Sequence, residues 1–203
     1  MEDDILILGG GAAGLMAAIA AKRAAPGARV TILEAGDRVG KKILSTGNGR
    51  CNLTNLRARA GDYAPAPVGA VLGQFPPERV LAAFAQMGLC FREEEDGRVY
   101  PASDAASSVL DALRLTCAHL GVRERTGFLA VRARRGREGF TLEAEGGERA
   151  QGARLLLSTG GKAGSRVSGY DVAEQLGHSV TRLLPGLAPL KTDGAGLKGL
   201  NGV

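Results

Sequence analysis

The feature that most constrains this chain is a glycine-rich turn, Gly9-Gly10-Gly11-Ala12-Ala13-Gly14, which lies between an apolar run and an alanine-rich stretch. The apolar run, residues 5–8 (ILIL), predicts a parallel strand buried on both faces. The alanine-rich residues 12–25 predict a helix that ends at Pro26-Gly27. Residues 29–33 (RVTIL) predict a second strand. Together these segments predict a βαβ unit of about 30 residues, the length that a right-handed crossover needs.

The turn matches the GxGxxG pattern at Gly9, Gly11 and Gly14. The first glycine permits a tight turn from strand to helix, the second lets the backbone approach a pyrophosphate, and the third lets helix and strand pack closely. The first amides of the helix supply free donors and the positive end of the helix dipole. We therefore expect an anion at this turn, with Gly10 and Ala13 as further contacts.

An acidic residue follows the turn at the distance that dinucleotide-binding proteins use. Glu34 stands at the end of the second predicted strand, 20 residues after Gly14. A carboxylate at this place accepts hydrogen bonds from a ribose 2′-OH and repels a 2′-phosphate. The combination favours FAD or NAD over NADP.

The order of the later segments favours FAD. Residues 35–75 are predicted to be mostly irregular, and a loop of that length is usually functional. A helix is then expected within residues 78–88, and a hairpin over residues 91–100 turns at Asp96-Gly97. Next comes a helix that Ser103 or Asp104 would cap and Gly121 would close.

The remaining segments complete a flavoprotein-like order. The segments VRER, FLAVRAR and GFTLEAE within residues 122–145 predict a β-meander. Residues 153–157 (ARLLL) predict another buried parallel strand, followed by Ser158-Thr159-Gly160-Gly161. Residues 170–176 predict a helix that stops at Gly177. In simple NAD enzymes a further βα unit would follow the acid much sooner.

The loop after the acid carries groups that suit a phosphate or a ribitol chain. Arg50 can neutralise the charge of a pyrophosphate. The other candidates are side chains that donate hydrogen bonds and glycines that permit close backbone approach: Ser45, Thr46, Asn48, Gly47 and Gly49. The alternative interpretation is an ordinary polar surface loop.

Composition excludes several other classes of protein. Aromatic residues make up 4% of the chain and tryptophan is absent, which argues against the stacking platforms of single-strand nucleic-acid binders. The net charge of +5 is spread out, apart from a modest group at Arg132, Arg134, Arg135 and Arg137. We therefore expect a solvated basic surface and no nucleic-acid partner.

Cysteine and hydropathy patterns point to the cytoplasm. The three cysteines show no CxxC spacing, so no disulfide framework or thiol redox pair is expected. The start MEDDILILGGG resembles neither a signal peptide nor a membrane span, and no later run reaches the length of a span. No metal-ligand cluster is predicted, and His119 and His178 are interpreted as structural.

Four segments resemble the BaiN-like flavoproteins, also described as aminoacetone oxidase family FAD-binding enzymes or NAD(P)/FAD-dependent oxidoreductases. They are GGGAAGLMAA, LEAGDRVGKKILSTGNGRCNLTN, GRVYPASDAASSVLDAL and LSTGGKAG…SGYDVAEQLGH. The resemblance implies an α/β fold, a Rossmann-like FAD/NAD(P)-binding domain of glutathione-reductase type with a β-meander, interrupted by a second, β-rich domain. Because members of the family are longer, we expect this chain to be the N-terminal portion, with the FAD-binding domain at residues 1–184, a helical and hairpin insertion at about 62–120, and the start of the second domain at 185–203.

The resemblance also implies which residues contact FAD. By position, Gly9, Gly11, Gly14 and Glu34 match the pyrophosphate and ribose contacts, and Ala130 matches a backbone contact to adenine. Further matches lie along the cofactor loop and in a turn beside the FAD: Lys42, Ser45, Thr46, Gly47, Gly49, Arg50, Cys51 and Asn52, then Thr159, Gly160 and Gly161. Cys51 is interpreted as a packing or backbone contact. No catalytic residue is named, because a flavin carries the hydride chemistry itself.

The expected function is an FAD-dependent oxidoreductase that moves a hydride or an electron pair between flavin and a small organic substrate, with NAD(P)H as a candidate donor. Two alternatives stay open. One is a non-catalytic dinucleotide-binding fragment, and the other is a flavin-dependent RNA-modifying protein. The sequence assigns neither the substrate nor the oligomeric state.

Overall fold

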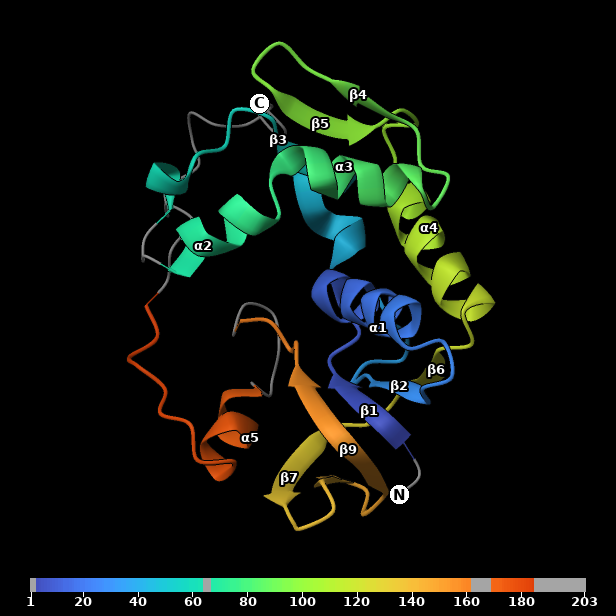
Figure 1. Cartoon of the computed structure of the whole chain (residues 1–203), viewed down its shortest axis with the longest axis vertical. Coiled ribbons are helices and arrows are strands. Elements are labelled where there is room, and N and C mark those ends of the chain that lie inside the picture. The colour runs from blue at the N-terminus through green and yellow to red at the C-terminus, as the bar shows by residue number, and fades with distance from the viewer. Residues whose placement is uncertain (1–2, 64–66, 162–168, 185–203) are drawn as a thin grey trace, which may run out of the picture.

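The computed structural model describes residues 3–63, 67–161 and 169–184, which build a six-stranded sheet with helices on both sides (Figure 1). The strands lie in the order β6-β2-β1-β9-β8-β7. Their bounds are β1 Asp3–Leu8, β2 Val30–Leu33, β6 Arg123–Arg125, β7 Ala130–Arg135, β8 Phe140–Ala144 and β9 Arg149–Leu157.

The first four strands of that order are parallel, so their carboxyl ends lie along one edge of the sheet. In the register, Leu8 pairs with both Leu33 and Leu157, and Leu33 pairs with Arg125. The chain adds strands on one side of β1 first and then crosses to the other side to form β9. This topology confirms the predicted Rossmann-type α/β fold, and it places a topological switch point between β1 and β9.

Strand β9 belongs to both halves of the sheet. It runs parallel to β1 and antiparallel to β8, and Gly152 pairs with Asp3 on one side and Phe140 on the other. The predicted meander is therefore confirmed for β7 and β8, and the parallel strand predicted at residues 153–157 is confirmed as the part of β9 that pairs with β1. The structure also extends the meander to β9, which the sequence did not predict. Placing VRER in it was wrong, because β6 pairs in parallel with β2.

The expectation that residues 153–157 form a fully buried strand was also wrong. Leu155 and Leu157 pack against the core, whereas Leu156 is 40% exposed. An apolar run alone cannot distinguish a strand covered on both faces from one covered on a single face.

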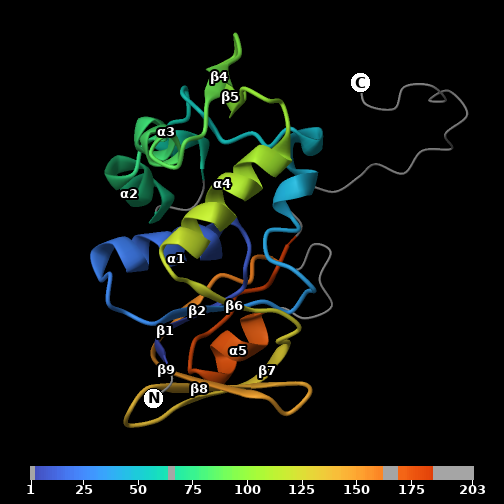
Figure 2. The ribbon, with the colours of Figure 1, turned by 90° about the vertical axis from the view of Figure 1, so that its right-hand side faces the viewer.

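Two apolar clusters lie on opposite faces of the sheet, as the alternation of side chains in a strand requires. Ile7 of β1 faces α1 (Ala12–Ala24) and α4 (Ala106–His119). Leu6 and Leu8 face the meander and Val172 of α5 (Gly169–Gln175). Figure 2 shows α1 and α4 on one side of the sheet and α5 on the other.

A long excursion connects β2 to β6 on the α1 side of the sheet (Figure 1). It contains the hairpin β4–β5, which confirms the predicted turn at Asp96-Gly97, and Gly97 has a φ of 83°. The hairpin gains a third strand, β3, which the sequence did not predict. The elements of the excursion before α4 are η1 Ile43–Gly49, β3 Thr54–Asn55, η2 Ala60–Asp62, α2 Pro67–Gln74, α3 Pro77–Ala85, β4 Phe91–Glu93 and β5 Arg98–Pro101.

Two local predictions in this excursion were wrong. Residues 67–74 form helix α2 instead of irregular chain, and its two glycines, which lower helix propensity, hid it. Helix α4 begins after Ala105 and receives no side-chain cap from Ser103 or Asp104. Asp104 instead has a φ of 53° and directs its carboxylate to arginines.

The other helices confirm the predictions within a few residues, and Gly121 and Gly177 have the positive φ of helix-ending glycines. In the described part of the chain, none of the helices has the length and apolar content that crossing a bilayer requires. Residues 185–203 lie outside the described residues, so the boundary between residues 1–184 and a second domain stays a prediction.

Candidate functional site

Three loops meet where β1, β2 and β9 end. The Gly9 amide donates to the carbonyl of Leu33 at 2.8 Å, which fixes the glycine turn to the end of β2. The Ser158 amide donates to the carbonyl of Leu8, and the Ser158 hydroxyl donates to the carbonyl of Gly9, both at 2.8 Å. The glycine turn, Glu34 and residues 158–161 therefore share one edge of the sheet, at the switch point.

The three glycines of the motif differ in what surrounds them. A Cβ on Gly9, whose φ is 104°, would lie 2.6 Å from the carbonyl oxygen of Ser158. A Cβ on Gly14 would overlap the carbonyl oxygen of Gly9 and lie 2.8 Å from the Ser158 hydroxyl. A Cβ on Gly11 would meet nothing within 4 Å. Gly9 and Gly14 are therefore required by packing, whereas Gly11 faces open space.

The first turn of α1 presents free donors beside that space. Gly11 is the N-cap residue and provides no side-chain cap, and the first turn carries no acidic residue. The amides of Ala12, Ala13 and Gly14 have no partner within the helix, because the first intrahelical acceptor serves Leu15. Ala12 and Ala13 are exposed. The turn thus has the positive character and the access that an anionic group needs.

Glu34 is fastened to the same turn through its side chain. One carboxylate oxygen accepts from the Gly10 amide at 2.7 Å, and the other accepts from the Gly36 amide at 2.8 Å. A Cβ on Gly10 would lie 2.6 Å from Val39 and 3.1 Å from the carboxylate, so this position also needs glycine. Each carboxylate oxygen keeps a second lone pair for a ligand hydroxyl.

The predicted cofactor loop forms η1 and the turn after it. Gly47, Asn48, Gly49 and Cys51 all have positive φ, between 55° and 84°. Cys51 is buried and donates its amide to Thr46 at 3.0 Å. The other loop residues predicted from the sequence are exposed: Lys42, Ser45, Thr46, Gly47, Gly49 and Asn52. Their polar groups are therefore accessible to a ligand.

Arg50 differs from these exposed residues, because its side chain is half-buried and paired within the protein. Its guanidinium contacts Glu94 at 2.5 Å and Asp104 at 2.9 Å and lies 3.9 Å from the centroid of the Tyr100 ring. Glu94 belongs to an acidic run at residues 93–96 of the hairpin, yet it is only 29% exposed and pairs with Arg50. Hydrogen bonds from Arg50 to both carboxylates raise its pKa above the ordinary value.

The remaining predicted contacts come from the start of β7 and from the turn after β9. Ala130 begins β7 and is buried. The Phe128 amide, two residues before it, donates to the Glu34 carbonyl at 2.9 Å. Thr159, Gly160 and Gly161 directly follow β9, and neither of these two glycines has an atom within 4 Å of an added Cβ.

Sequence reasoning missed the residues that hold this site together. Ser158 was interpreted only as part of a turn, although its hydroxyl joins β9 to the glycine turn. Glu94 was not singled out, and Asp104 was predicted only as a candidate helix cap. Their distance along the sequence from Arg50, 44 and 54 residues, left no local signal of the pairing.

His119, His178 and Cys117 are further reactive side chains among the described residues. His119 and His178 are exposed. Cys117 is fully buried on α4 against the Leu15 carbonyl, and burial raises the pKa of its thiol to about 12. Among the described residues, no group of three His, Cys, Asp or Glu side chains is arranged to hold a metal ion.

Comparisons with known proteins agree with this geometry. The family described as HI0933-like protein Rossmann domain matches residues 3–198. The chain is 42% identical over 192 residues to a 3-dehydro-bile acid delta(4,6)-reductase of Clostridium scindens, covering 91% of this chain and 46% of that protein. It is 31% identical over 193 residues to a ribosomal RNA dihydrouridine synthase of Escherichia coli, covering 92% and 47%. The chain thus spans about half the length of the curated relatives it matches.

Solved structures share the fold at low sequence identity. Glycine oxidase from Geobacillus kaustophilus superposes with a TM-score of 0.61 at 16% identity, covering 87% of this chain and 59% of that chain. THI4 from Thermovibrio ammonificans superposes with a TM-score of 0.58 at 14% identity, covering 87% and 64%. The family match, the curated relatives and the strand topology agree with the resemblance seen in the sequence, and this chain belongs to the HI0933-like Rossmann-domain family, with the BaiN-like relationship confirmed.

Proposed function

We propose that this chain is the FAD-binding part of an FAD-dependent oxidoreductase. The observation that carries the proposal is the open space at Gly11, next to the unpaired amides of Ala12 and Ala13 and to the fixed carboxylate of Glu34. A side chain at Gly11 would fill this space, so the residues present fit a dinucleotide whose pyrophosphate lies on the helix and whose ribose binds the carboxylate.

FAD fits this arrangement better than NAD does. The loop from Lys42 to Asn52 provides a second row of exposed polar groups beyond the glycine turn. A nicotinamide dinucleotide bound to a simple Rossmann unit has no need of such a loop. Membership of a family with a reductase relative supports oxidoreductase chemistry.

The residues of this chain would bind and orient the cofactor. The amides of Gly11, Ala12 and Ala13 would hold the phosphates, Glu34 the ribose of the adenosine, and the exposed loop with Thr159–Gly161 the flavin half. Bound flavin supplies hydride or electron-pair transfer. Glu34 also disfavours a 2′-phosphate, because its carboxylate would repel the added charge.

The substrate proposed for the whole protein is a small organic molecule. The Clostridium scindens relative is named as a bile acid reductase, and a ring system of that kind is one candidate substrate class. NAD(P)H is the proposed electron donor. The cytoplasmic location stays a prediction from the sequence, which assigns no oligomeric state.

The direct test is FAD binding by the purified chain, followed through flavin absorbance at about 450 nm and through a fluorescence titration with added FAD. We expect one FAD per chain, and no saturable binding of FAD would contradict the proposal. Glu34→Gln should weaken binding by about 1–3 kcal/mol, because an amide cannot accept from both the Gly10 and Gly36 amides and loses the ribose contact. Glu34→Ala should weaken it at least as much. Glu138→Gln, on the turn between β7 and β8, is the matched control and should leave affinity unchanged.

A second candidate is a flavin-dependent RNA-modifying protein. It is favoured by the Escherichia coli relative, which is named as a ribosomal RNA dihydrouridine synthase. If this candidate is right, the chain should bind ribosomal RNA or heparin with an affinity that falls steeply with salt. Retention independent of salt would exclude it.

A further inference from the structure

The position of the Arg50 side chain has a consequence for the cofactor loop. Glu94 follows β4, Asp104 precedes α4 and Tyr100 lies in β5, so a single side chain of the loop contacts three separate parts of the excursion. Asp104 also contacts Arg92 at 2.5 Å. We call Arg50, Glu94, Asp104 and Tyr100 the arginine clamp.

The backbone around Arg50 is strained. Asn48 and Cys51 are not glycines, yet their φ values are 55° and 59°. Left-handed conformations are uncommon for residues other than glycine, and they persist where the surroundings enforce them. Arg50 lies between these two residues, and its own amide donates to Gly47 at 3.1 Å. The clamp is therefore placed where an anchor for the turn is needed.

Asp104, one partner of Arg50, contacts the arginine instead of capping α4. Asp104 is well placed in sequence to cap α4, but it adopts a φ of 53° and leaves the helix without a side-chain cap. The acidic partners and the aromatic ring occupy the guanidinium of Arg50 with contacts inside the protein. A free phosphate-binding arginine would be expected to point its fork toward solvent instead.

We propose that Arg50 is a positioning residue, which holds the turn at residues 47–51 in the conformation that receives the cofactor, instead of neutralising the pyrophosphate directly as the sequence suggested. This inference rests on the proposed function for the identity of the ligand. Pre-organising a binding loop improves affinity because the loop's ordering does not oppose binding. Loss of the clamp lowers the population of the competent turn, and apparent affinity falls by the same factor.

Two variants and a control test the clamp. Arg50→Met removes the arginine, and Glu94→Gln with Asp104→Asn keeps the arginine but removes both negative charges. Arg98→Met is the control, because it deletes an arginine–aspartate pair with Asp96 on the same hairpin without touching the loop. Two quantities are measured in each: hydrogen exchange at the amides of residues 50 and 51 without FAD, and the Kd for FAD. A thermal melt shows that each variant is folded.

In both clamp variants the amides of residues 50 and 51 should exchange roughly tenfold faster than in the wild type, and the Kd for FAD should be roughly tenfold higher. Arg98→Met should change neither the exchange rate nor the Kd more than about twofold. Combining the two variants should weaken FAD binding little further, because both variants break the same interaction. If Arg50 instead binds phosphate directly, the Glu94→Gln/Asp104→Asn variant frees it, and FAD binds more tightly and with a steeper salt dependence; that result overturns the proposal.

The two proposals fail in different ways. Unchanged exchange at residues 50 and 51 overturns the clamp even if FAD binds. Faster exchange with unchanged FAD affinity also overturns it, because the turn would then be irrelevant to the cofactor. If neither the wild-type chain nor the Glu34 variants bind FAD, the proposed function itself is wrong. The role of the clamp toward a cofactor is then wrong as well.

Discussion

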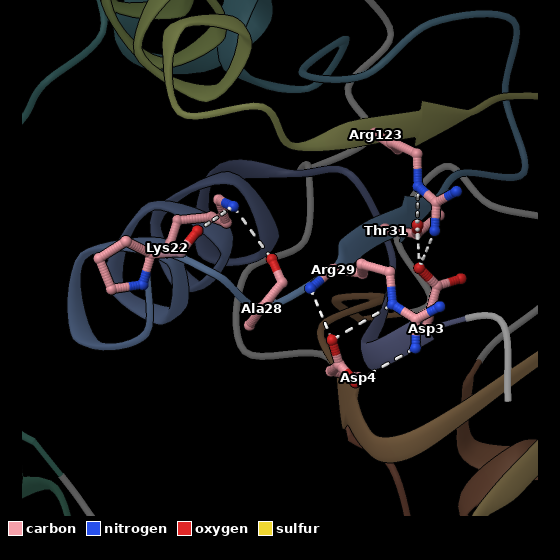
Figure 3. A network of polar contacts seen from close by, with 8 residues as sticks. Asp3, Asp4, Lys22, Ala28, Arg29, Thr31 and Arg123 are labelled. Carbon is pink, nitrogen blue, oxygen red and sulfur yellow. Dashed lines mark hydrogen bonds and ion pairs between the residues drawn. The ribbon is translucent and has the colours of Figure 1, made fainter.

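The two edges of the parallel sheet use their polar groups in opposite ways. At the amino edge, buried Asp3 accepts from the Thr31 hydroxyl at 2.7 Å and pairs with Arg123, and Asp4 accepts from the Arg29 amide at 2.8 Å (Figure 3). Lys22 reaches back from α1 to the Ala28 carbonyl at 3.0 Å. Side chains of opposite charge thus satisfy one another within the protein.

At the carboxyl edge the backbone provides most of the polar groups. Gly11 has open space where a side chain would be, and the amides after it have no partner in the helix. Glu34 is the charged side chain fixed at the turn, and it is held by backbone amides instead of a cation. From this comparison we propose that the amino edge contributes mainly to stability and that the carboxyl edge receives an anionic ligand, so substitutions at the two edges should separate stability from binding.

The largest expected effect is on binding, from Gly11→Val. Its side chain would occupy the space where we place the pyrophosphate, so FAD affinity should fall by more than about 100-fold, or about 3 kcal/mol. Stability should fall by at most about 1 kcal/mol, because valine is a poor N-cap. A fluorescence titration and a urea melt measure the two quantities. Unchanged FAD affinity in this variant would show that the turn has been wrongly assigned.

Gly14→Ala should do the reverse, because the new Cβ would overlap the Gly9 carbonyl and crowd the Ser158 hydroxyl. We expect a loss of up to about 3 kcal/mol in the free energy of unfolding. Urea denaturation measures this loss. A variant as stable as the wild type would mean that β1, α1 and β9 do not pack as closely as described.

Asp3→Ala should cost about 1–3 kcal/mol of stability, because it leaves the buried Thr31 hydroxyl without its acceptor. Its Kd for FAD should stay within about twofold of the wild type, since Asp3 lies at the opposite edge. The same melts and titrations apply. An Asp3→Ala protein that is stable but binds FAD poorly would abolish the distinction between the edges.

The smallest effect is expected from Asp4→Asn and depends on pH. The Arg29 amide and side chain hold the pKa of Asp4 below its ordinary value. The contribution of Asp4 to stability is therefore present at neutral pH and is lost as the pH falls below about 4. Melts across this range should show wild type and variant converging in acid, and a difference that grows in acid would refute the assigned sign.

The sequence predicted local contacts well and distant contacts poorly. The strand, turn, helix and acid at Ile5 to Glu34 form a local pattern, so the βαβ unit and the candidate contacts at Gly11 and Glu34 followed from spacing, whereas the complete fold class was implied by the family resemblance. The partner of β6 could not be predicted, because its three residues carry no distinguishing periodicity. The arginine clamp joins residues far apart in the chain, and only the folded structure brings those charges together.

The most direct test of the carboxyl edge as a dinucleotide site is an amide NMR titration of the chain with FAD. We predict that the resonances of Gly11, Ala12 and Ala13 shift with a common affinity, while those of Asp3 and Thr31 at the amino edge do not move. Shifts confined to residues away from the glycine turn, with Gly11 to Ala13 unmoved at saturating FAD, would contradict the account.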